Sequence, residues 1–188
     1  RLLWIFEGFT SYYDDLMLVR SGAVDRSAYL GLLAKTISNV QRGPGRRTQS
    51  IAESSFDAWI KFYRQDENAP NAIVSYYAKG SLVALALDLT IRERTRGRHS
   101  LDDVLRAMWE RYGKSAFDGG EGLVEDAFPR LLEETVGLRL DAQIRAWAYG
   151  TAELPLASLL RPFGVRLELG AGDQGPVSIG ARLAMRDG

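Results

Sequence analysis

The 188-residue sequence contains no cysteine and a single histidine, His99. The absence of cysteine excludes disulfides, thiolate zinc sites and cysteine nucleophiles, and leaves the redox compartment open. Lysine and arginine together number 24, as do aspartate and glutamate, so no net charge attracts nucleic acid or an anionic membrane. We therefore expect no nucleic-acid partner, and we expect the arginines of 42–47 and 92–98 to occupy solvated loops and helix ends.

Long hydrophobic runs are also missing. The longest stretch that is nearly free of charge, 78–91, contains Lys79 and Asp88 and is too short to cross a bilayer. A hydrophobic content of 46% nevertheless supports a substantial core, so we expect a soluble globular protein without a membrane span. Because Arg1 lies inside an expected helix, without an initiator methionine or signal peptide, we expect a fragment, and its localisation, periplasmic or cytoplasmic, stays open.

Helical spacing of apolar residues dominates most of the chain. Glycine, proline and capping residues punctuate the pattern, and the segment 65–72 is expected to be a polar loop. The predicted helices run from Leu3 to near Ser21 and Gly22, from Asp25 to the breaker 42–47, over 53–64, from Ser75 or Tyr76 to about Arg96, over 100–113, near 123–136 and near 141–149.

The pattern changes after 150–156. The segments VRLEL (165–169) and VSIGARLAM (177–185) are typical of β-strands, and a glycine-rich turn separates them. Two strands alone are only marginally stable. The predicted fold is therefore mainly α, with a helical body over 1–158 and the first hairpin of an incomplete β module over 159–188.

Glu7 lies among apolar and aromatic residues in the opening stretch RLLWIFEGFTSYYDDL. A carboxylate removed from water needs a compensating partner, so taken alone it predicts an ion pair with an arginine or a contact with a tyrosine. The alternative is a metal ligand. A catalytic zinc takes three protein ligands, often two histidines and a carboxylate, and only the carboxylate is available here because His99 stands alone in a polar turn.

Two motifs carry a family resemblance. The stretch W-x-x-E-G-F-T-x-Y-Y contains Glu7, and the stretch Y-x-K-G runs from Tyr77 to Gly80. Together with the patterns over 100–114 and 128–156, they resemble the glycyl aminopeptidase family of gluzincin zinc metallopeptidases. The resemblance implies that Glu7 completes the zinc sphere and that the Tyr77 hydroxyl stabilises the reaction's oxyanion, with Tyr76 as the neighbouring alternative.

The same resemblance implies that the chain is the helical C-terminal subdomain of such a peptidase, followed by the start of a PDZ-like module. The intact parent would be a zinc-dependent metallo-aminopeptidase that hydrolyses peptides near their amino terminus, with a preference for glycine or alanine. The HExxH histidines and general-base glutamate are absent from this sequence. We therefore expect the chain alone to be inactive and to hold no zinc, although Gly8 is expected to permit close approach of two helices.

Several alternatives stay open. Tyr77 could simply pack in the core, and Asp14 and Asp15 could either orient the absent histidines or form solvated helix surface. Partners would be a peptide substrate and a ligand of the PDZ-like module, while substrate-binding residues and the oligomeric state are unknown. The rival function is a non-catalytic helical scaffold joined to a PDZ-like peptide-binding module, derived from a degenerate peptidase.

Overall fold

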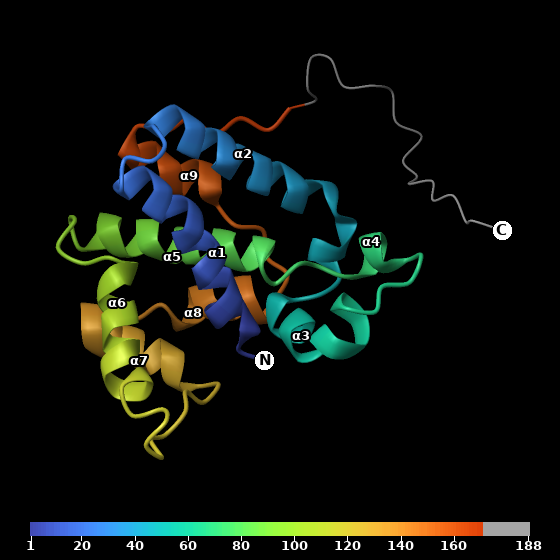
Figure 1. Cartoon of the computed structure of the whole chain (residues 1–188). Coiled ribbons are helices and arrows are strands. Elements are labelled where there is room, and N and C mark those ends of the chain that lie inside the picture. The colour runs from blue at the N-terminus through green and yellow to red at the C-terminus, as the bar shows by residue number, and fades with distance from the viewer. Residues whose placement is uncertain (171–188) are drawn as a thin grey trace.

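The computed structural model describes residues 1–170, and this part of the chain is entirely helical (Figure 1). The α-helices are α1 (Leu3–Arg20), α2 (Arg26–Arg42), α3 (Ile51–Phe56), α4 (Ala69–Ala72), α5 (Ala78–Arg94), α6 (Leu101–Met108), α7 (Ala127–Val136), α8 (Asp141–Ile144) and α9 (Leu156–Leu160). Short 3-10 turns form η1 (Pro44–Arg47) and η5 (Arg161–Phe163), and π-helical turns form η2 (Ala58–Phe62), η3 (Trp109–Gly113) and η4 (Arg145–Tyr149).

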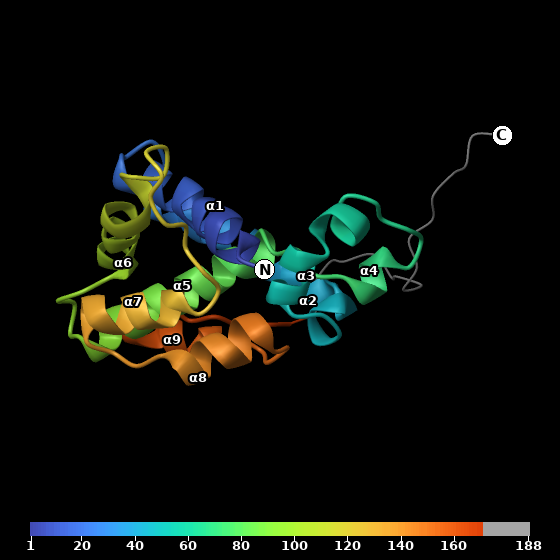
Figure 2. The same cartoon turned by 90° about the horizontal axis from the view of Figure 1, so that it is seen from below.

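Helix α5 is the centre of the fold. Its residues 79–91 are all buried, in agreement with a sequence that is apolar around the whole helix. Helix α1 lies along one side of α5, while α8 and α9 lie on the other, as the view from below makes clear (Figure 2). No helix within residues 1–170 has the length and apolar content needed to span a membrane.

Helices α1 and α5 form the most extensive helix pair in the described chain. At their crossing Gly8 faces Gly80, and a Cβ atom added to Gly8 would lie only 2.7 Å from the Gly80 Cα. The sequence predicted a close approach at Gly8 between its helix and an HExxH helix, which this chain does not contain. In the described structure the approaching helix is α5, so Gly8 of the first motif and Gly80 of the second meet at one point.

Capping residues explain where several helices begin and end. Asp25 caps α2 by accepting a hydrogen bond from the Ala28 N–H, and Ser100 with Asp103 forms a capping box at the start of α6. Gly22 has a φ of +78° just after α1, and Gly97 has a φ of +75° just after α5. The predicted positions of these helix ends are confirmed.

Three local predictions need correction. The expected polar loop 65–72 contains the short helix α4, and the expected helix 53–64 divides into α3 and η2. Strand formation at 165–169 is wrong, because these residues contain no strand in the described part of the chain. A strand requires a hydrogen-bonded neighbour, and the expected partner 177–185 lies outside the described residues. The expected domain boundary after residue 158 falls inside α9 and stays a prediction.

Candidate active site

Glu7 lies on α1, immediately before the Gly8–Gly80 crossing. Its side chain is partly buried, and among residues 1–170 no ion pair or side-chain hydrogen bond joins it. The partner that the sequence predicted for this carboxylate, an arginine or a tyrosine bonded directly to it, is therefore not found in the described structure. Its negative charge does reach two tyrosines, since it adds to the raised pKa of Tyr77 and opposes the lowering of the pKa of Tyr63.

Three tyrosines gather where α5 begins. The Tyr76 hydroxyl donates to the Tyr63 oxygen at 3.2 Å, and the Tyr63 and Tyr77 hydroxyls share a hydrogen bond of 3.0 Å in which either can donate. Tyr76 is only 1% exposed, whereas Tyr63 is 52% exposed and Tyr77 is partly exposed. The three hydroxyls, hereafter the tyrosine triad, thus extend from the core to the surface beside Glu7.

The tyrosine triad has distinct proton affinities. The hydrogen bond to Tyr63, followed by burial and the charge of Glu7, raises the pKa of Tyr77. Burial and the hydrogen bonds to its neighbours raise the pKa of Tyr76. Its hydrogen bonds with Tyr76 and Tyr77 lower the pKa of Tyr63. At neutral pH the Tyr77 hydroxyl is therefore protonated and available as a hydrogen-bond donor.

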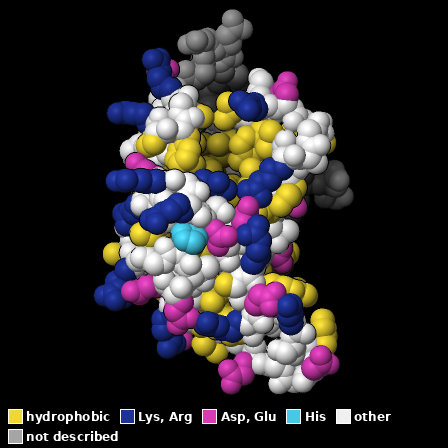
Figure 3. Space-filling view, turned by 90° about the vertical axis from the view of Figure 1, so that its left-hand side faces the viewer, with side chains coloured by type: hydrophobic (Ala, Val, Ile, Leu, Met, Phe, Trp, Pro, Cys, Tyr) yellow, Lys and Arg dark blue, Asp and Glu magenta, His cyan; other side chains and the backbone are white. Residues whose placement is uncertain are grey.

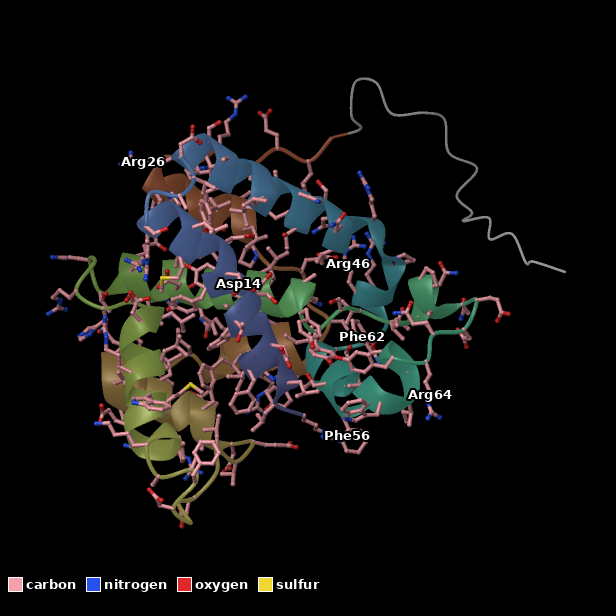
Figure 4. All side chains as sticks on the ribbon, in the orientation of Figure 1. Asp14, Arg26, Arg46, Phe56, Phe62 and Arg64 are labelled. Carbon is pink, nitrogen blue, oxygen red and sulfur yellow. The ribbon has the colours of Figure 1, made fainter. Side chains whose placement is uncertain are left out.

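Aromatic packing surrounds the triad and α1. Phe62, the last residue of η2 (Figure 4), has its ring centroid 4.9 Å from that of Tyr76 and 6.0 Å from that of Tyr77. On α1, Trp4 is fully buried and makes edge contacts with Phe9 and Phe128. These contacts join the start of α5 to η2, and α1 to α7.

The remaining sequence candidates lie away from this cluster. Asp14 is exposed on α1 (Figure 4), at the edge of an apolar groove of about 440 Å³ between α1 and α6. His99 lies on the surface among charged side chains (Figure 3), with its Nδ1 atom 3.5 Å from the Asp103 carboxylate. Within residues 1–170 no group of three metal-ligating side chains exists. Glu7 is therefore not part of such a three-residue group in the described chain.

Sequence reasoning missed the role of Tyr63 and Lys79. Tyr63 ends the aromatic run FDAWIKFY, which was a usable signal, but nothing local indicates that its hydroxyl meets Tyr77. Lys79 of the Y-x-K-G motif is 3% exposed, burial lowers its pKa, and its Nζ donates to the Arg46 carbonyl at 3.2 Å. Arg46, expected to be solvated, is 7% exposed and pairs with Glu153 at 3.0 Å.

A glutamate beside tyrosine hydroxyls, on two helices that cross at paired glycines, is the arrangement that the gluzincin resemblance implied. Residues 1–83 match the model of a metallopeptidase family described as M61 glycyl aminopeptidase. Over residues 1–83 the chain is thus similar to the M61 glycyl aminopeptidases, which confirms the family resemblance noted in its sequence for this range. Glu7, the tyrosine triad and both glycines of the crossing all lie within the matched range.

A solved structure extends the relationship beyond residue 83. The crystal structure of an aminopeptidase N family protein from Idiomarina loihiensis is 44% identical in sequence, with a TM-score of 0.82. The match covers 87% of this chain and 27% of that protein, so the chain spans about a quarter of the length of its relative. No curated protein matches the chain.

Proposed function

We propose that this chain is the helical part of a zinc-dependent metallo-aminopeptidase, in which Glu7 is a zinc ligand and Tyr77 stabilises the oxyanion. The observation that carries the proposal is the position of Glu7, a partly buried carboxylate without an ion-pair partner among residues 1–170, beside a protonated tyrosine hydroxyl. Its carboxylate suits zinc, which accepts oxygen ligands in catalytic sites. The remaining ligands would come from an HExxH helix elsewhere in the parent protein.

Each residue has a limited task in this proposal. Glu7 supplies one carboxylate to the metal, and bound zinc would polarise the scissile carbonyl and lower the pKa of water. The Tyr77 hydroxyl donates a hydrogen bond to the carbonyl oxygen as negative charge develops on it. Partial exposure favours Tyr77 over Tyr76 for this contact, because Tyr76 is buried. The glycine or alanine preference rests on the family name alone.

The test uses the metallopeptidase of which we propose this chain is a part. Tyr77→Phe should lower kcat on glycyl and alanyl p-nitroanilides by about a hundredfold or more, with zinc content unchanged, because one oxyanion donor is lost. Glu7→Ala should lower the zinc-to-protein ratio measured by plasma mass spectrometry. Tyr13→Phe is the matched control, since its hydroxyl bonds Asp102 at 2.6 Å, away from the triad.

Three results would contradict the proposal. Full turnover in Tyr77→Phe would remove the oxyanion role, and full zinc content in Glu7→Ala would remove the ligand role. Tight one-to-one zinc binding by the 188-residue chain alone would contradict the assignment of ligands outside it, because Glu7 supplies only one of the three required. The PDZ-like module of the rival reading, a scaffold joined to a peptide-binding domain, lies mostly outside the described residues.

A further inference from the structure

Tyr63 carries no role in the motifs that led to the proposed function, yet it is the junction of the triad. It follows η2, and its hydroxyl lies within hydrogen-bond distance of both Tyr76, at 3.2 Å, and Tyr77, at 3.0 Å. The contact to Tyr77 joins residues fourteen positions apart in different elements. A residue that bonds to the expected catalytic group from a separate element is suited to orient that group.

The direction of the hydrogen bonds within the triad decides what Tyr77 can do. A tyrosine hydroxyl donates one hydrogen bond and accepts up to two. Because Tyr76 donates to Tyr63, the Tyr63 hydrogen remains free to donate. If Tyr63 donates to Tyr77, the Tyr77 hydrogen is free for a substrate; if Tyr77 donates to Tyr63, the outward hydrogen belongs to Tyr63. Rotation about the two C–O bonds exchanges these states without moving the rings.

We propose that Tyr63 is a positioning residue for Tyr77, forming the directed series Tyr76 to Tyr63 to Tyr77 to substrate carbonyl when substrate is bound. The inference rests on the proposed function. Hydrogen bonds in a series polarise one another, so a donor from Tyr63 strengthens the bond that Tyr77 gives to a developing negative charge. The series starts at Tyr76, whose buried ring, 1% exposed, fixes the inner end.

Ring packing holds Tyr63 in place independently of its hydroxyl. Its ring centroid lies 5.2 Å from that of Trp59 and 5.4 Å from that of Phe62. Phe62 in turn packs against Tyr76 and Tyr77 at 4.9 and 6.0 Å. Phenylalanine at position 63 would therefore keep the aromatic contacts and remove only the hydroxyl, which makes the substitution a specific test of the hydrogen bonds.

The test measures glycyl p-nitroanilide hydrolysis by the zinc-loaded parent metallopeptidase. Tyr63→Phe should lower kcat by about three- to tenfold, the effect of one neutral hydrogen bond, while KM and zinc content stay within twofold of wild type. In a Tyr77→Phe background, Tyr63→Phe should cause no further loss, because it acts through Tyr77. A merely structural role would instead lower kcat equally in both backgrounds.

Four outcomes would overturn the inference. An unchanged kcat in Tyr63→Phe would show that the bond has no catalytic role, and an equal loss in both backgrounds would show a separate role. A loss as large as that of Tyr77→Phe would make Tyr63 the donor itself. Full turnover in Tyr77→Phe would overturn both this inference and the oxyanion role, whereas a large loss there with an unchanged Tyr63→Phe would overturn only this inference.

Discussion

The pair α1–α5 brings together two carboxylates in opposite situations. Asp88 on α5 is 3% exposed and accepts hydrogen bonds of 2.8 Å from the Tyr12 hydroxyl, the Arg92 Nε and the Leu101 N–H. Glu7 on α1 is partly buried and receives no side-chain partner from residues 1–170. One helix pair thus contains a carboxylate with three hydrogen-bond donors, Asp88, and a carboxylate with no side-chain hydrogen bond or ion pair among residues 1–170, Glu7.

The difference separates structural from functional acids by a physical criterion. A buried carboxylate is retained at little net cost only when donors and an opposite charge replace its water shell, as at Asp88. An acid left without them beside aromatic side chains contributes little to folding and remains able to bind a cation. The contrast predicts that substitutions at the two positions have different consequences for stability and for metal binding.

The largest effect on stability is expected at Asp88. Asp88→Ala would leave the Arg92 guanidinium, the Tyr12 hydroxyl and the Leu101 N–H without their shared acceptor, and should lower the free energy of unfolding by about 3–5 kcal/mol. Urea unfolding of this chain followed by circular dichroism measures the change. Asp14→Ala, which removes an exposed carboxylate from α1, is the control and should stay within about 0.5 kcal/mol. A similarly small change in Asp88→Ala would remove the distinction.

An intermediate effect is expected where the helices cross. In Gly8→Ala the new methyl group would lie 2.7 Å from the Gly80 Cα, so α1 must shift away from α5. The free energy of unfolding should fall by about 1–3 kcal/mol in the same urea measurement. The control is Gly31→Ala on α2, where no atom lies within 4 Å of an added Cβ. That variant should gain about 0.5–1 kcal/mol from helix propensity. Equal effects in the two variants would contradict a tight crossing.

The smallest stability effect is expected at Glu7. Glu7→Gln keeps the size of the side chain and removes its charge, and the unfolding free energy should stay within about 0.5 kcal/mol of wild type because no described partner is lost. If the same substitution lowers the zinc content of the parent enzyme, Glu7 differs from Asp88 in metal binding as well as in its contribution to stability. A loss above about 1.5 kcal/mol would instead reveal a stabilising contact of Glu7 and place it in the same category as Asp88.

Much of the helical scaffold was predictable because its signals are local. Asp25 caps α2, Gly97 ends α5, and the apolar sequence of α5 correctly predicted a central buried helix. The strand expected at 165–169 failed because alternation of apolar and polar residues specifies which side of an extended segment is buried, but not whether a second strand is available to pair with it. Strand formation depends on that distant partner.

The candidate site was predictable only through its motifs. Glu7 and Tyr77 were identified from W-x-x-E-G-F and Y-x-K-G, but their proximity depends on how α1 and α5 fold against each other. Tyr63 could not be found in this way, because a hydrogen bond between two hydroxyls fourteen residues apart leaves no spacing signature in a sequence. Arg92 pairs with Asp88 at a visible i,i+4 spacing, but the Tyr12 and Leu101 donors come from other segments and leave no such signal.

The paired glycines at positions 8 and 80 have a consequence for how this architecture can vary. Backbone meets backbone there, so the interval between the two helices is set by atoms that every amino acid shares and not by any interchangeable side chain. The separation between Glu7 on α1 and Tyr77 at the start of α5 is therefore limited at the crossing by main-chain contact, and only a side chain introduced at position 8 or 80 would widen it directly.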